Sequence, residues 1–289
     1  MSHALITTPA LRTLLASGTP LLLCDCSFDL ADPAAGARLH AQRHLPGAIH
    51  IDLDSDLAAP KQAGAGRGRH PLPNPDAFAR RLQQLGFADD LAVVAYDSSG
   101  GMYAARLWWM LRWLGHSAVQ VLDGGMDAWV AAGGPVPAAA PATVPSGAAP
   151  RQFTRRPSLV TQVDFAGLLA ELGRPPRLVV DARAADRFRG ENETLDPVGG
   201  HIPGAANRFF RHNLAPDGCF KPAEQLRAEW LALLAGRAPA DVVAQCGSGV
   251  TACHNLLALE AAGLPGAALY PGSWSEWCAQ PQAPIATGA

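Results

Sequence analysis

Four sequence blocks occur twice, in the same order, in this chain of 289 residues. Equivalent positions in the two copies are 147 to 157 residues apart. A repeat of this length indicates two duplicated domains, each with its own core, and excludes a solenoid of short repeats. The paired blocks are "LLLCD" (21–25) with "RLVVD" (177–181), "HLPGA" (44–48) with "HIPGA" (201–205), "VVAYDSSGGMYAARLWWMLRWLG" (93–115) with "VVAQCGSGVTACHNLLALEAAG" (242–263), and "LDGGMDAW" (122–129) with "LYPGSWSEW" (269–277).

A proline-rich stretch, "GGPVPAAAPATVPSGAAPRQF" (133–153), separates the two copies. It has no apolar periodicity, and its five prolines exclude a continuous helix, so we interpret it as an extended linker. We therefore expect an N-terminal domain at 1–137, a linker at 138–157 and a C-terminal domain at 158–289.

Short apolar runs alternate with helical patterns in each copy. Strands that are apolar on both faces and are separated by helices indicate a mainly parallel sheet flanked by helices, so we predict an α/β fold in each domain. Gly86 and Gly115 follow two of the helical patterns as C-terminal caps. The expected strands are 21–26, 92–96, 119–124, 177–183, 241–246 and 268–272, and the expected helices are 75–86, 101–115, 222–234 and 249–263.

Composition excludes several classes of function. The formal net charge of −2 gives no support for a nucleic-acid or anionic-membrane partner. No apolar run approaches the roughly 20 residues of a membrane span, and we find no signal peptide at the N-terminus, so we expect a cytoplasmic protein. The six cysteines include one close pair, Cys24 and Cys26, without a second pair to complete a zinc site. We therefore expect no metal and no disulfide scaffold.

Cys246 stands where a predicted strand gives way to a short loop and then a helix, in "AQCGSGVT". In open α/β sheets this is where ligands bind. Gly247 and Gly249 allow the loop to curl with its N–H groups pointing inward, and the helix start favours an anion such as a thiolate or a persulfide. The alternative is a small buried residue at a strand end. The first copy has Asp97 at this position, and Asp cannot accept a sulfur atom.

Two other chemistries use similar loops. A cysteine phosphatase needs C-x5-R, but residue 252 is alanine. A disulfide oxidoreductase needs C-x-x-C, whereas Cys253 lies seven residues after Cys246, too far along a helix for a disulfide. We expect Cys253 to face the core.

The repeated blocks, the "DGGMDAW" segment and the "CGSGVTA" loop resemble those of two-domain rhodanese-type sulfurtransferases over nearly the whole chain. The resemblance implies a catalytically silent first domain and a persulfide on the cysteine of the second domain, here Cys246. Members of that family that use thiosulfate typically carry "CRKGVTA", whereas "CGSGVTA" is typical of those that use 3-mercaptopyruvate. A neutral loop suits a donor with a single carboxylate and a ketone, because the hydroxyls of Ser248 and Thr251 can hydrogen-bond the developing enolate.

The resemblance also implies which side chains bind the donor. The arginine before the aromatic residue in "DARAADRFRG" is Arg187, a ligand for the donor carboxylate. A second family arginine is absent from "ENETLDPVGG" (191–200), and Arg183 or Arg189 could replace it. His44 in "HLPGA" matches a histidine near the loop serine that serves proton transfer, with a backbone-bonded loop histidine as the alternative. We expect catalytic roles for Cys246, Ser248 and His44, and donor contacts from Arg187, Gly247, Gly249, Val250 and Thr251.

The resulting hypothesis is transfer of sulfur from 3-mercaptopyruvate to cyanide, a thiol or a thioredoxin-like protein without any cofactor. Thiosulfate as the donor and a persulfide carrier that serves a protein partner are the alternatives.

Overall fold

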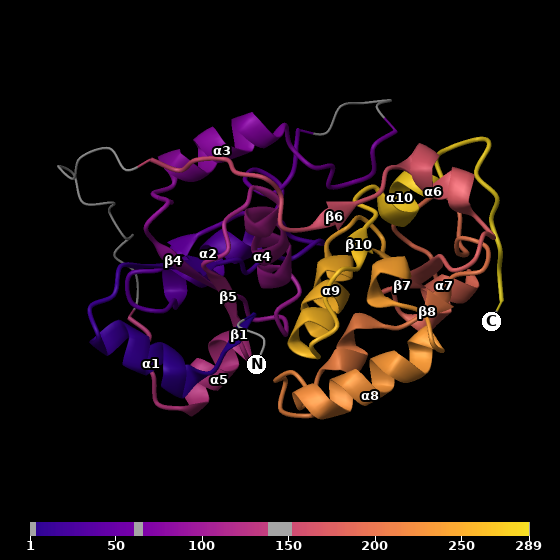
Figure 1. The fold of residues 1–289 in the computed structure, drawn as a ribbon. Helices are drawn as coiled ribbons and strands as arrows, with labels where there is room; N and C mark the ends of the chain where they lie inside the picture. The colour runs from indigo at the N-terminus through magenta and orange to yellow at the C-terminus, as the bar shows by residue number, and fades with distance from the viewer. Residues whose placement is uncertain (1–3, 61–65, 138–151, 289) are drawn as a thin grey trace.

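The computed structural model describes residues 4–60, 66–137 and 152–288. They form two lobes, one for each sequence copy (Figure 1). Of the predicted linker, residues 138–151 lie outside the described residues. The last part of the linker packs against the first domain. The Phe153 ring contacts Phe87 edge-on, and the backbone N–H of Arg156 donates to the Leu114 carbonyl.

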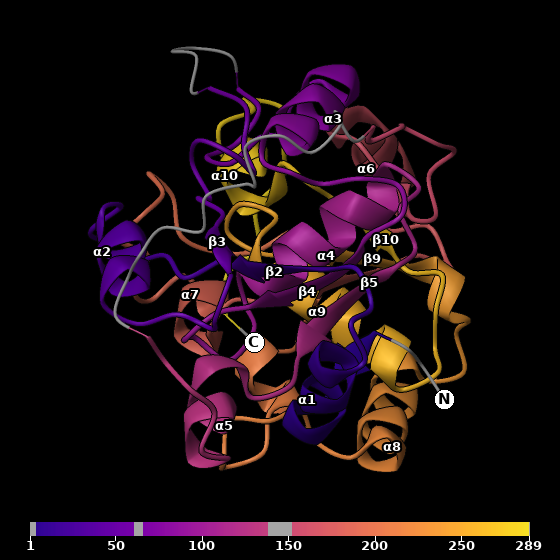
Figure 2. The same ribbon diagram turned by 90° about the vertical axis from the view of Figure 1, so that its left-hand side faces the viewer.

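The first lobe contains one five-stranded sheet in the order β1-β5-β4-β2-β3, with every pair of neighbours parallel. Helices α1 and α5 lie below this sheet and α3 lies above it in both Figure 1 and Figure 2. The strands are β1 (Leu5–Ile6), β2 (Leu21–Asp25), β3 (Ile49–His50), β4 (Ala92–Tyr96) and β5 (Val119–Leu122). The helices are α1 (Thr8–Ala16), α2 (Ala35–Gln42), α3 (Pro75–Gln84), α4 (Ala104–Trp113) and α5 (Gly125–Ala131).

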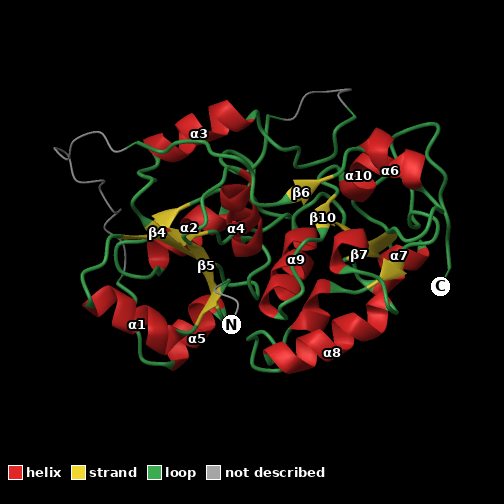
Figure 3. Cartoon of the chain, viewed as in Figure 1, coloured by secondary structure: helices red, strands yellow, loops and turns green. Residues whose placement is uncertain are grey.

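The second lobe has the order β6-β10-β9-β7-β8, again with parallel neighbours throughout. Figure 3 shows helices on both sides of the strands in each lobe. The strands are β6 (Thr161–Gln162), β7 (Leu178–Asp181), β8 (Ala206–Asn207), β9 (Val242–Gln245) and β10 (Ala268–Leu269). The α-helices are α6 (Phe165–Glu171), α7 (Ala185–Arg189), α8 (Ala223–Leu234), α9 (Thr251–Ala261) and α10 (Ser273–Trp277), with short 3₁₀ helices at Phe210–Asn213 and Pro239–Asp241.

The two strand orders are identical when β1 is matched with β6, β2 with β7, and so on to β5 with β10. The duplication and the α/β class predicted from the sequence are therefore confirmed. The short edge strands and the helices before β2 and β7 lacked a clear pattern in the sequence, and they were not predicted.

Alternating strand residues divide the apolar core into three layers. Outer clusters bury one face of each sheet under α1 and α5 or under α6 and α10. The opposite faces share a single central cluster that contains α4 and α9, which pack against each other between the two sheets (Figure 1). One continuous core therefore joins the two domains.

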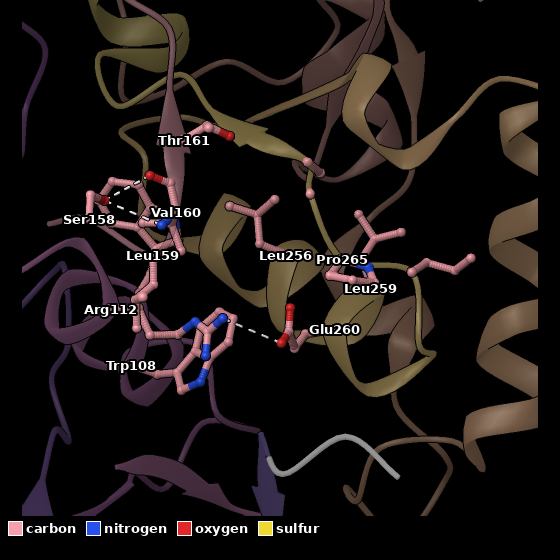
Figure 4. Close-up of a pocket in the computed structure, with 14 residues that line it drawn as sticks. Trp108, Arg112, Ser158, Leu159, Val160, Thr161, Leu256, Leu259, Glu260 and Pro265 are labelled. Carbon is pink, nitrogen blue, oxygen red and sulfur yellow. Dashed lines mark hydrogen bonds and ion pairs between the residues drawn. The ribbon is translucent and has the colours of Figure 1, made fainter. Parts of the chain in front are cut away.

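Charged groups also cross the domain interface. Figure 4 shows Arg112, near the end of α4, facing Glu260, near the end of α9, and their charged groups lie 3.4 Å apart. Among the residues that the structure describes, no helix is long and apolar enough to cross a membrane.

Candidate active site

Cys246 follows directly after β9, and the loop 246–250 leads into the first turn of α9. Val243 belongs to the outer cluster, whereas Ala244 and Cys246 belong to the central one. Strand alternation therefore turns the Cys246 side chain toward the other domain. It is only 2% exposed.

Helix α10 braces this loop from outside. The backbone N–H of Trp274 donates to the Cys246 carbonyl, and that of Ser275 donates to the Gly247 carbonyl, each at 2.9 Å. The N–H of Cys246 in turn donates to Ser273 Oγ at 3.0 Å. The carbonyl groups of Cys246 and Gly247 are thus turned toward α10.

The same contacts orient the loop's N–H groups. A trans peptide points its C=O and N–H in opposite directions, so the N–H groups of Gly247 and Ser248 point away from α10. Within the described part of the chain, neither donates to an acceptor, and the same is true of Gly249 and Val250. Four neighbouring N–H donors of the loop that follows Cys246 are therefore available to a ligand.

The first domain shows what such a loop binds. The carboxylate of Asp97, which occupies the position of Cys246, accepts from four backbone N–H groups at 2.7–3.0 Å. Their donors are Ser99, Gly101, Tyr103 and Ala104. Burial raises the pKa of Asp97, and these four hydrogen bonds oppose that rise. The loop after the fourth strand is therefore an anion cradle, which Asp97 fills with its own carboxylate.

Gly249 is required by the geometry of the second loop. Its φ is +76°, and a Cβ there would overlap the carbonyl oxygen of Pro271. The Gly249 carbonyl accepts from Arg106 NH1 at 3.1 Å, so α4 of the first domain holds this turn of the loop.

A cavity of about 170 Å³ lies in front of Cys246. It brings together most of the predicted site: Cys246, Ser248, Arg187, Gly247, Val250 and Thr251 all line it, and Arg69, Met102 and Tyr103 of the first domain close it. A different cavity of about 250 Å³ lies near the C-terminal ends of α4 and α9 (Figure 4). Figure 4 shows Trp108 and Leu256 on its walls, but no cysteine lines it, so it lies apart from the cysteine loop.

The histidine beside Ser248 is His70, which sequence reasoning missed. His70 Nδ1 lies 2.7 Å from Ser248 Oγ, and its Nε2 lies 3.4 Å from Asp54 Oδ1. Because a carboxylate only accepts, Asp54 favours the tautomer with the proton on Nε2, which leaves Nδ1 to accept from the Ser248 hydroxyl. Asp54, His70 and Ser248 thus form a chain that crosses the domain interface.

The expectation that His44 lies near Ser248 is wrong. His44 Nδ1 is 2.8 Å from the His40 carbonyl, and the two rings stack at 4.4 Å within the first domain. This is the structural alternative, a loop histidine bonded to backbone. Nothing in the repeat blocks marked His70, since the stretch 51–73 is not among them.

Arg187 lies in the cavity as predicted, but a carboxylate of the protein already binds one side of it. Glu193 accepts from Arg187 NH2 at 2.8 Å and from its Nε at 3.0 Å. Arg183 is buried against Asp181 and the Gly200 carbonyl, at 2.7 and 2.6 Å.

Neither candidate for the second arginine is free to bind a donor. Arg183 borders the cavity, but its guanidinium already binds Asp181, Glu193 and the Gly200 carbonyl, and its side chain is only 1% exposed. Arg189 pairs with Glu191 at 2.6 Å and is not among the residues that line the cavity.

Arg106 is a second residue that sequence reasoning missed. It is completely buried on α4, and besides Gly249 it donates to the carbonyls of Leu57 and His70. Burial lowers the pKa of Arg106. This one side chain therefore fixes the cysteine loop and the His70 segment relative to each other.

The other cysteines do not contribute to this site. Cys253 Sγ donates to the Gly249 carbonyl at 3.3 Å, and burial raises its pKa to about 12, as befits a core thiol. All six cysteines are free. Among the described residues, no group of three or more His, Cys, Asp or Glu side chains is arranged to hold a metal ion.

Comparison with known protein families identifies the family of this architecture. Residues 7–132 and 165–280 match the rhodanese-like domain, once in each lobe. The chain belongs to the rhodanese-like domain family. The sequence prediction of a two-domain rhodanese-type sulfurtransferase is confirmed, whereas its exact domain boundaries stay a prediction.

Named relatives of this rhodanese-like chain are sulfurtransferases with different donors. It is 48% identical over 289 residues to the "Probable 3-mercaptopyruvate sulfurtransferase" of Pseudomonas aeruginosa, covering 100% of both chains. It is 34% identical to the thiosulfate sulfurtransferase of Bos taurus, covering 90% of this chain and 86% of that one. The 3-mercaptopyruvate sulfurtransferase structure from Leishmania major superposes with a TM-score of 0.84 at 30% identity, covering 98% of this chain and 76% of that one.

Proposed function

We propose that this protein transfers sulfur from 3-mercaptopyruvate to a thiophilic acceptor through a persulfide on Cys246. The observation that carries the proposal is that Cys246 starts a loop with four available N–H donors and shares its cavity with Ser248, the first member of the Ser248–His70–Asp54 chain. The first feature stabilises a sulfur anion, and the second can move a proton.

In the first half-reaction, the Cys246 thiolate attacks the sulfur of 3-mercaptopyruvate. A sulfur–sulfur bond forms and the carbon–sulfur bond breaks, and its electron pair leaves with the three-carbon fragment as the enolate of pyruvate. A proton then converts this enolate to pyruvate. Ser248, with His70 behind it, is placed to deliver that proton.

This proton requirement favours 3-mercaptopyruvate over thiosulfate. An enolate is a strong base and needs protonation to leave, whereas sulfite leaves as a stable dianion. The donor cavity offers uncharged hydroxyls from Ser248 and Thr251 in place of loop cations. Arg187 is the expected ligand for the donor carboxylate.

Thiosulfate is the second candidate donor. A specific observation favours it, because Arg69 and Arg187 both line the cavity and two guanidinium groups suit a dianion. The Bos taurus relative carries this donor in its name.

In the second half-reaction, an acceptor thiolate or cyanide attacks the outer sulfur and restores the Cys246 thiolate. The cavity in front of Cys246 suits a small acceptor or a protruding thiol. A thioredoxin-like protein is the macromolecular acceptor that we propose. A persulfide carrier would turn over only with its own partner protein.

The test is the ratio of kcat/KM for 3-mercaptopyruvate to that for thiosulfate, with cyanide as the acceptor. Cys246→Ser provides the blank. We expect a large ratio and no turnover in the variant. A ratio near or below one would contradict the donor assignment, and turnover that required an added partner would favour the carrier.

A further inference from the structure

A second cation lies beside Cys246, and it comes from the other domain. A Cβ built on Gly247 would lie 2.7 Å from Arg69 NH2 and 3.6 Å from Arg187 NH2. Gly247 is the residue that follows the nucleophile. The two guanidinium groups therefore converge on this point from the two domains.

The Arg69 side chain is held in place at this position. Its backbone N–H donates to Ser275 Oγ at 3.0 Å, next to the brace on the cysteine loop. Its NH1 group forms a short ion pair with Asp196, whose side chain is 3% exposed. Asp196 Oδ2 also lies 3.6 Å from Arg187 NH2, so one buried carboxylate connects both arginines.

The contacts of Arg69 leave one arm available. NH1 is occupied by Asp196, whereas NH2 has no acceptor within the described part of the chain and is the atom nearest Gly247. A guanidinium has five N–H donors in a planar fork that matches a carboxylate. The free arm of Arg69 and the outer edge of Arg187 thus border the same part of the cavity.

We infer that Arg69 is the second arm of the donor's anion site, with Asp196 as its built-in counter-ion. This inference rests on the proposed function. It replaces the arginine that is absent from residues 191–200 with one from the first domain. The ligand class is a small carboxylate with a sulfur atom two or three bonds from the acid group, bound between the two domains.

The test is steady-state kinetics of Arg69→Gln with both donors. Hydrogen bonds to charged groups contribute about 1.5–3 kcal/mol, so we expect kcat/KM for the donor to fall roughly 10-fold to 100-fold, mainly through KM. Arg69→Lys keeps the charge without the fork and should be intermediate. Arg67→Gln is the matched control, because Arg67 is exposed on the same segment and does not line the Cys246 cavity. We expect it to match the wild type.

Asp196→Asn separates the anion site from a structural ion pair. This variant breaks the same pair but keeps both cations, so we expect KM to fall because no carboxylate competes with the donor. An equal rise of KM in Asp196→Asn and Arg69→Gln would overturn the inference. So would an Arg69→Gln variant with wild-type KM and a lower melting temperature.

The outcomes distinguish this inference from the proposed function. If the wild type uses thiosulfate and not 3-mercaptopyruvate, the proposed donor is wrong. A higher KM for thiosulfate in Arg69→Gln would still support Arg69 as the second arm of the anion site. If the wild type uses 3-mercaptopyruvate and Arg69→Gln has the same KM, only the role of Arg69 is wrong. If Arg69→Gln is too unstable for kinetics, calorimetric titration of the wild type and Arg69→Lys with pyruvate gives the same comparison. We expect weaker binding to Arg69→Lys. Equal binding would contradict the role of Arg69.

Discussion

At the scale of single residues, the sequence predicted the groups on the cysteine loop and missed the groups that approach it. Cys246 and Ser248 are recognisable because a strand, a short glycine-containing loop and a helix follow one another along the chain. His70, Arg69 and Arg106 reach the loop only through tertiary packing. Local pattern contains no information about such distant contacts, and the family resemblance indicated His44 instead of His70.

The corrected histidine leads to a first prediction. We expect His70→Asn to lower kcat with 3-mercaptopyruvate by roughly 100-fold or more, because general acid–base groups typically contribute that much. The pH profile of kcat should change shape as well, since the Ser248 hydroxyl loses its partner. Stopped assays of pyruvate formation across the pH range measure both effects.

His44→Asn is the control for this prediction. His44 is buried and stacked on His40, and it is not among the residues that line the Cys246 cavity. We expect its kcat to stay within a few-fold of the wild type. A large loss in His44→Asn together with normal turnover in His70→Asn would contradict the assignment.

At the scale of elements, the loop after the fourth strand is the unit that differs in use between the domains: in the first it binds the Asp97 carboxylate, and in the second it carries Cys246. The apolar runs of β2, β4, β7 and β9 and the helical patterns of α3, α4, α8 and α9 were predictable. Both faces of these strands are buried and each of these helices has at least ten residues, so their periodicity is clear. The shape of the cysteine loop was not predictable, because it depends on contacts of its carbonyl groups with α10 and α4.

The loop shape leads to a second prediction, on Gly249. We expect Gly249→Ala to lower the melting temperature and abolish sulfur transfer, because the residue has positive φ and the new methyl group would overlap Pro271. Gly218→Ala is the matched control, with φ of +82° and open space around its Cβ position. It should show only the backbone strain of about 1–2 kcal/mol and keep activity. Thermal denaturation and turnover assays of both variants test this prediction. Equal losses of melting temperature and activity in the two variants would refute the steric argument.

At the scale of the whole molecule, the first domain, which has Asp97 in place of the cysteine, is part of the candidate site. It supplies His70, Asp54 and Arg69, and its Arg106 fixes the cysteine loop. The sequence indicated the duplication and the loss of the nucleophile at Asp97. The relative placement of the two domains depends on the shared central core, which alternating patterns within one domain do not reveal.

Acid should weaken this interface through His254, which leads to a third prediction. Its Nε2 lies 3.0 Å from the Gly100 carbonyl of the other domain, and its Nδ1 lies 3.3 Å from Asn213 Nδ2. Burial lowers its pKa to about 4, so the unfolded chain binds more protons between pH 4 and about 6.5. The free energy of unfolding is therefore unaffected by this group above about pH 6.5. As the pH falls toward 4, it decreases by on the order of 3 kcal/mol.

Melting temperatures of the wild type and His254→Gln measure this effect. Carboxylates also titrate in this range. The quantity of interest is therefore the difference between the two proteins in the slope of melting temperature against pH. We expect a steeper decline in the wild type between pH 6.5 and 4. Parallel curves would show that His254 does not contribute to acid sensitivity.

The most direct test of the whole account is a single turnover with 3-mercaptopyruvate in the absence of any acceptor. We predict that intact-protein and peptide mass spectrometry find one added sulfur atom on Cys246, with one pyruvate released per modified chain, and that cyanide then removes the sulfur. Cys246→Ser should gain no sulfur. Sulfur on another cysteine, or pyruvate release without any modification of Cys246, would contradict the account.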